Sequence, residues 1–366
     1  MLARFRRTGW PLALAVLALT ACSDTPLEPK KPADPLATAA NIQALDASFS
    51  SPTFQSFAVA GTYSPAAAAA LAPVRAVLRA TQPTLSARRA LSPAESRLAA
   101  RSLAVALVPF SGGVSASVLP PGILGVTYEW NGTTYADLGR TGAPPDGVRF
   151  ILYALDAGGV PIVTQEIGYA DLIDQSNATT DRLHILVVGT TTGSPVTYLD
   201  YTVSVTVGTT SGSATVVGFV TDGTHRLDFN VSLTATASRV TVDIRFDVNA
   251  EDAHVQLKIT LTAPDQNTLQ LAIDFRLQFG TEVVTVRGTT TLDATTGTAS
   301  GTVTVGVNGG IYATITETND SRTYTGGGGQ ELSAEDLTAL SAILDAVGTT
   351  LERFDELLAP AGSAGV

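Results

Sequence analysis

Few residues of this chain have the type and spacing that acid–base, nucleophilic or metal chemistry requires. The 366 residues include one cysteine, Cys22, and three histidines, His184, His225 and His254. The histidines are far apart, and no His-Glu-x-x-His pattern places two of them on one helix face for zinc. The body of the chain has no thiol for nucleophilic catalysis. We therefore expect that the protein is not an enzyme and that it holds no metal or other cofactor.

One acidic stretch carries oxygen ligands at alternate positions. Asp247, Asn249 and Glu251 form an Asp-x-Asn-x-Glu pattern that Asp252 follows, and calcium prefers oxygen clusters of this kind. An EF-hand loop needs glycine at its sixth position, where this chain has Asp252, and a glutamate at its twelfth, which is absent here. A solvated acidic turn between two strands explains these residues, so we predict no metal site.

The single cysteine stands at the end of an N-terminal export signal. Arg4, Arg6 and Arg7 precede an apolar run at 10–19, which is too short to cross roughly 30 Å of hydrocarbon as a helix. The sequence Leu-Thr-Ala-Cys, ending at Cys22, follows this run. With these features the chain resembles the bacterial lipoproteins, whose lipobox is a leucine, two small residues and a cysteine.

The resemblance covers residues 1–22 only, and it implies that the thiol of Cys22 is lipidated and the chain is cut just before it. The alternative is a plain secretory signal that leaves a stray thiol. A free thiol is a liability in an oxidising compartment, so the lack of other cysteines favours lipid attachment. In the family, a serine such as Ser23 after the cysteine suggests the outer membrane. We expect a cell-envelope protein whose lipid anchor makes the membrane its partner.

The composition fits an exported β-rich protein. The chain has 22 Lys and Arg against 33 Asp and Glu, a net charge of −11, and only 15% of its residues are charged. Phosphate contacts need a basic face, so we expect that no nucleic acid is a partner. From the distribution of proline, capping and alternation signals we predict a signal peptide at 1–21, a lipidated cysteine and proline-rich tether at 22–40, a mainly helical segment at 41–110, an antiparallel β domain at 111–325, and a glycine linker with a C-terminal helix at 326–366.

The last predicted helix is amphipathic. Ser333 stands at its N-cap, and Asp336 follows three residues later. Its polar side is acidic, whereas helices that lie on membranes prefer Lys and Arg, so we expect it to pack on the protein's own sheet. Its apolar positions recur at steps of three and four residues: Leu337, Leu340, Leu344, Val347, Leu351, Phe354 and Leu358.

Alternating apolar and polar residues run from about residue 125 to residue 318 and predict long strands. Asn131-Gly132 predicts a hairpin with a two-residue type I′ turn, because both positions tolerate positive φ. Roughly a dozen strands at about 4.8 Å each make a flat sheet about 58 Å wide, which must curl, close or fold into two layers. The clearest predicted strands are 225–237, 240–248, 255–261 and 269–279.

The predicted fold is therefore mainly β: a long-stranded antiparallel meander curled into a barrel or half-barrel, with N-terminal helices and the C-terminal amphipathic helix packed on its apolar face. An outer-membrane barrel with its apolar face in lipid is an alternative, against which the 6% aromatic content and the helical end weigh. A curled sheet with an apolar interior is the architecture of envelope carriers, which suggests a bound lipid or other hydrophobic small molecule. A structural or surface-interaction lipoprotein with a fully packed interior is the other alternative. The predicted ligand-lining residues are Phe229, Ile244, Leu257, Leu271 and Phe275.

Overall fold

The computed structural model describes most of the C-terminal two-thirds of the chain. Cys22, the tether and the predicted helical segment 41–110 lie outside the described residues, as does the part of the C-terminal helix after residue 344. The described residues are 117–344, apart from 191–193, 222, 224–225, 249–251, 266, 294, 320 and 342.

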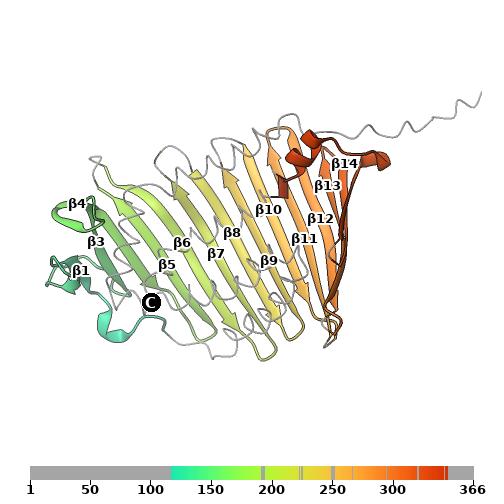
Figure 1. Ribbon diagram of the computed structural model, residues 1–366. Helices are drawn as coiled ribbons and strands as arrows, with labels where there is room; N and C mark the ends of the chain where they lie inside the picture. The colour runs from blue at the N-terminus through green and yellow to red at the C-terminus, as the bar shows by residue number, and fades with distance from the viewer. Residues whose placement is uncertain are drawn as a thin grey trace, which may run out of the picture.

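Fifteen strands form one sheet in which spatial neighbours are nearly always neighbours in sequence (Figure 1). The order runs from β15 back to β3 and ends with β1 and β2. The strands are β1 (Thr127–Trp130), β2 (Tyr135–Asp137), β3 (Gly147–Leu155), β4 (Pro161–Asp174), β5 (Thr180–Gly189), β6 (Val196–Val207), β7 (Ser211–Thr221), β8 (Arg226–Thr236), β9 (Arg239–Val248), β10 (Ala253–Thr262), β11 (Thr268–Phe279), β12 (Glu282–Asp293), β13 (Thr298–Val307), β14 (Gly310–Thr318) and β15 (Ser321–Gly326).

The mainly antiparallel β class and the four clearest predicted strands are confirmed. These strands correspond to β8, β9, β10 and β11, and each pairs antiparallel with the next. Short connections join them, and a short connection can only link antiparallel neighbours. The exception lies at the N-terminal end, where β1 pairs parallel with β3 while β2 folds back on β1.

The predicted barrel is not confirmed, because the sheet is open. Its edge strands are β2 and β15, and the strands that the structure describes do not pair these two edges with each other. Figure 1 shows a long band that turns progressively from the green strands to the red ones. Strand twist accumulates in this way across a wide sheet.

The predicted turn at Asn131-Gly132 has a different length in the structure. Trp130 pairs with Tyr135, so the loop between β1 and β2 has four residues, not two. The side-chain oxygen of Asn131 accepts hydrogen bonds from the amides of Thr133 and Thr134, both at 2.9 Å. This local bonding of asparagine to the backbone favours the longer loop over a type I′ turn.

The C-terminal helix is described over residues 334–344, and it lies beside β14 (Figure 1). The amide of Asp336 donates to the hydroxyl of Ser333, and the carboxylate of Asp336 accepts from the Ser333 amide, which confirms the predicted cap. The hydroxyl of Tyr312 on β14 donates to the backbone oxygen and the carboxylate of Asp336, at 3.1 and 3.2 Å. These bonds fix the start of the helix to the sheet.

The buried stripe of this helix agrees with the prediction at Leu340 but not at Leu337, and it includes Ile343, which was not predicted. Leu340 and Ile343 are buried, but Leu337 is 42% exposed. Asp336 is turned toward the sheet by its bond with Tyr312, so the neighbouring Leu337 faces away. The connection before the helix is the short turn Gly327–Gly329, in which Gly328 has a φ of 72° that favours glycine.

The end of β4 holds the first described residues in place. The carboxylate of Asp174 accepts hydrogen bonds from the hydroxyl of Ser117 and from the amides of Val118 and Leu119. Burial acts to raise the pKa of Asp174, but its hydrogen bonds outweigh burial and hold the pKa below its usual value. Leu119 is consequently anchored against the sheet, where it is buried.

Candidate functional site

Three of the predicted ligand-lining residues form a continuous line across the centre of the apolar face. Ile244 on β9 pairs with Leu257 on β10, and Leu257 pairs with Phe275 on β11. Side chains of directly opposed strand residues lie on the same face of a sheet. All three are 0% exposed. They therefore lie in the packed interior.

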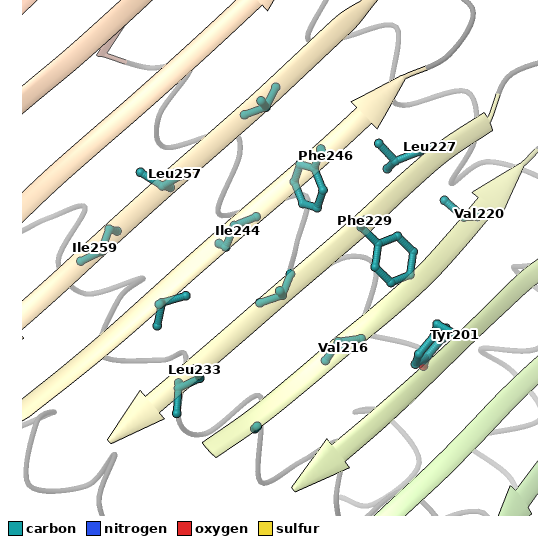
Figure 2. Close-up of a cluster of buried hydrophobic side chains, with 14 of the residues drawn as sticks. Tyr201, Val216, Val220, Leu227, Phe229, Leu233, Ile244, Phe246, Leu257 and Ile259 are labelled. Carbon is teal, nitrogen blue, oxygen red and sulfur yellow. The ribbon is translucent and has the colours of Figure 1, made fainter. Parts of the chain in front are cut away.

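The other two predicted residues lie on the same face but apart from this line. Phe229 on β8 pairs with Phe246 and is 3% exposed, and Figure 2 shows its ring on the same side of the sheet as Ile244. Leu271 pairs with Leu261 near the other end of β11 and is 6% exposed. The structure thus places the five residues on one buried surface without gathering them around a common point.

A cavity that described residues line on this face is small. It measures about 30 Å³ and lies between the strands β12 to β15 and Leu344 of the C-terminal helix. A lipid or drug-sized ligand needs about 300–1,000 Å³. None of the five predicted ligand-lining residues borders this cavity.

A polar atom within the apolar face was not predicted from the sequence. Tyr201 on β6 is 1% exposed, and its ring meets that of Phe229 edge to face with centroids 5.9 Å apart (Figure 2). Its hydroxyl has no hydrogen-bond partner among the described residues, and burial raises the pKa of this phenol. In the sequence, Tyr201 occupies an inward position of an alternating strand, where a phenylalanine is expected.

The opposite face of the sheet is exposed and carries charges in a regular order. Asp243 pairs with Lys258, Lys258 with Asp274, and Asp274 with Arg287, so charges of alternating sign occupy four adjacent strands. We call Asp243, Lys258, Asp274 and Arg287 the central charged row. The Nε atom of Arg287 donates to Asp274 at 2.9 Å, and the Nε atom of Arg245 donates to Asp243 at 3.2 Å.

A second row on this face consists almost entirely of hydroxyl side chains. It runs beside the central charged row across eleven strands, from β5 to β15, and alanine interrupts it once. Two neighbouring hydroxyl pairs in it are within 3.5 Å. We call it the threonine row: Thr180, Thr206, Ser213, Thr234, Thr241, Thr260, Ala272, Thr289, Thr302, Thr316 and Thr323.

The exposed face is hollowed over β11 to β14. The hollow has a volume of about 810 Å³ and is open to solvent. Short side chains line most of it, including Ala272, Thr289 and Thr302, and the Asp274–Arg287 pair lies at one side. The described residues that line it include no cluster of acid, base and nucleophile.

Of the candidate ligands singled out in the sequence, Asn249, Glu251 and His225 lie outside the described residues, whereas His184, His254 and the aspartates beside His254 are described. The Nδ1 atom of His254 donates to Asp247, and its Nε2 atom lies 3.4 Å from Asp252. The hydrogen bond with Asp247 raises the pKa of His254. His184 bonds with Asp200 at 2.8 Å on another strand pair. Within the described residues there is no group of three or more ligands that could hold a metal ion.

One partly buried ion pair was missed because its partners are far apart in sequence. Arg149 on β3 donates to both carboxylate oxygens of Asp171 on β4, at 2.6 and 2.7 Å. The guanidinium carbon of Arg149 also lies 3.8 Å from the ring centroid of Tyr169. The two charged residues are opposite one another in the strand register, so the pair holds β3 to β4.

No family model matches this chain, and no match was found among curated proteins or among solved structures. Over the part that the structure describes, helices lack the length and apolar character that a membrane span requires. The site therefore has to be interpreted from its own geometry.

Proposed function

We propose that this chain is a lipid-anchored protein of the cell envelope with a structural, surface-interaction role. Its sheet packs one face into the protein interior and presents the other face to a partner. The observation that carries this proposal is the burial of Ile244, Leu257 and Phe275, each 0% exposed at the centre of the apolar face. An interior packed in this way is dense enough to exclude a ligand.

The proposal includes a cover for the apolar face. Burial extends to strands such as β6 and β8, whereas the described part of the C-terminal helix lies beside β14. The sequence predicts helices over this face, and the residues concerned, 41–110 and those after 344, lie outside the described residues.

The anchor is proposed from the lipobox alone. Several acyl chains on Cys22 would hold the protein firmly, because each buried methylene contributes about 0.8 kcal/mol. Cells fed an alkyne-tagged fatty acid should label the wild-type chain and not a Cys22→Ala variant. A Cys22→Ser variant is the matched control: serine has nearly the size of cysteine but no thiol, so it should also stay unlabelled. A wild-type chain that takes up no label contradicts the anchor.

A second candidate function is the binding of a hydrophobic ligand that carries a hydrogen-bonding group. The buried hydroxyl of Tyr201 favours it, because an unpaired buried hydroxyl is costly and a ligand acceptor would satisfy it. Native mass spectrometry of the chain, extracted gently from its own host, separates the two candidates. The mass of the acylated chain alone supports the packed interior, and an additional stoichiometric lipid supports the carrier.

A further inference from the structure

The order of residues along the exposed face is self-complementary. The central charged row on β9 to β12 continues in register on both sides, so that it lies within a line of ten residues, one from each strand from β6 to β15. Along this line there are three hydroxyl residues, then the four charged residues, then three more hydroxyl residues. The signs within the four charges alternate, so the row reversed upon itself places every negative charge opposite a positive one. The ten residues are Ser204, Thr215, Ser232, Asp243, Lys258, Asp274, Arg287, Thr304, Thr314 and Thr325.

We propose that this face binds a second copy of the chain, face to face, about a two-fold axis that runs parallel to the strands between β10 and β11. Such an axis places each strand opposite a strand of the other copy, β10 opposite β11 and β9 opposite β12. Asp243 then faces Arg287 of the second copy, and Lys258 faces its Asp274. Each contact occurs twice, because a two-fold interface uses the same patch on both copies.

The neighbouring rows are compatible with the same axis. The threonine row of one copy faces that of the other, so hydroxyls that can both donate and accept lie opposite each other, except that Thr260 faces Ala272. On the other side of the charges, Arg245 faces Thr285 and Gln256 faces Arg276, so no like charges meet. Two exposed apolar residues on this face also meet: Val217 on β7 is 46% exposed, and Ile311 on β14 is 56% exposed.

The sizes of the side chains fit as well. The hollow over β11 to β14 has short side chains, and the axis places β7 to β10 of the second copy opposite it. Those strands carry the longer Arg239, Arg245 and Lys258. Arg239 faces Thr291 in this arrangement, and Arg245 faces Thr285, so long side chains stand opposite short ones.

The area is sufficient for a stable dimer. Ten strands at about 4.8 Å and three to four rows at about 7 Å give roughly 48 by 20 Å, or about 960 Å² per copy. A standard specific interface buries about 800 Å² per partner. Aligned sheets of this kind pack with their strands within about 30° of each other.

Charge exchange between the two copies tests the arrangement. Asp243 and Arg287 lie three strands apart within one chain but face each other across the axis. In full-length chains purified in mild detergent, Asp243→Arg alone and Arg287→Asp alone should each weaken dimerisation about 100-fold, about tenfold for each of two contacts that become repulsive. An equimolar mixture of the two variants should restore the dimer, because both contacts then join opposite charges.

A matched control uses Arg182, which lies in the same row on β5, beyond the ten strands that the axis relates. Arg182→Asp should leave the dimerisation constant within about twofold of wild type. Sedimentation velocity with one copy fluorescently labelled measures all four samples, and circular dichroism checks that each is folded. A second variant, Thr241→Cys with Thr289→Cys, should give covalent dimers with a bis-maleimide cross-linker about 8 Å long, because facing sheets lie about 10 Å apart whereas three strand spacings separate the two positions by about 14 Å within one chain.

A wild-type chain that stays monomeric at 100 times its cellular concentration overturns the proposal, as does a mixture that fails to dimerise where wild type does. The proposal names the partner for the exposed face and so depends on the surface role proposed above. A failed dimer proposal can be told apart from a failed anchor or a failed packed interior, because fatty-acid labelling tests the anchor and native mass spectrometry tests the packed interior.

Discussion

Replacing Leu257 by alanine probes the packing of the apolar face at its centre. Leu257 lies on β10 between Ile244 and Phe275, and its side chain is 0% exposed. The substitution removes three carbon atoms from this position and leaves the backbone pairing of β10 intact. Neighbours on a sheet held by hydrogen bonds on both sides can close the resulting space only in part.

The cost should be that of a large-to-small substitution in a rigid core. Leucine-to-alanine changes at buried sites destabilise proteins by about 2–5 kcal/mol, and full burial with strands on both sides puts this site at about 3–5 kcal/mol. With a urea m-value of about 2–3 kcal/mol/M, the unfolding midpoint should fall by about 1–2.5 M. Urea titration followed by circular dichroism measures this shift.

The matched control is Gln256→Ala, the adjacent residue on the same strand, which points to the other face. It should change the free energy of unfolding by less than about 0.5 kcal/mol. If Leu257→Ala costs no more than this control, the apolar face is not packed at its centre and the reasoning fails.

Two further substitutions test how segments are held to the sheet. Tyr312→Phe removes the hydroxyl that bonds the C-terminal helix to β14, so it should cost about 1 kcal/mol and speed hydrogen exchange in residues 334–344 above all; unchanged exchange there contradicts that role. The pKa of Asp174 is lowered in the folded protein, so its contribution to stability is complete above the unfolded pKa of about 4 and is lost as the pH falls through the folded value. Asp174→Asn should therefore lower the urea midpoint at pH 7 and flatten its decline toward pH 3, and an unaltered pH dependence argues against the assignment.

The strands were predictable because alternation and turn residues agree over long stretches. In β8 the apolar residues fall at every second position, and burial follows the same period. The open edge was not predictable, since closure depends on curvature and on which strands meet. The parallel pairing of β1 with β3 was also missed, because the Asn131 loop suggested a simple meander.

Side chains that depend on tertiary contacts account for the remaining differences. Leu337 has the right helical spacing for burial, but Tyr312 turns the helix so that Asp336 faces the sheet instead. The Arg149–Asp171 pair joins residues on different strands, and only the register reveals it. The self-complementary order of the exposed face likewise appears only when ten strands are aligned.

Cysteine accessibility along β10 tests the division of the sheet into a buried and an exposed face most directly. Single cysteines at positions 256, 257, 258, 259 and 260, each in a Cys22→Ser background, are treated with a maleimide in the folded protein. In the monomer, diluted below the dimerisation constant, we predict rapid labelling at 256, 258 and 260, and at least about 100-fold slower labelling at Leu257→Cys and Ile259→Cys, because only global or local opening exposes them. Equal rates at all five positions, or faster labelling at 257 and 259, contradict the account.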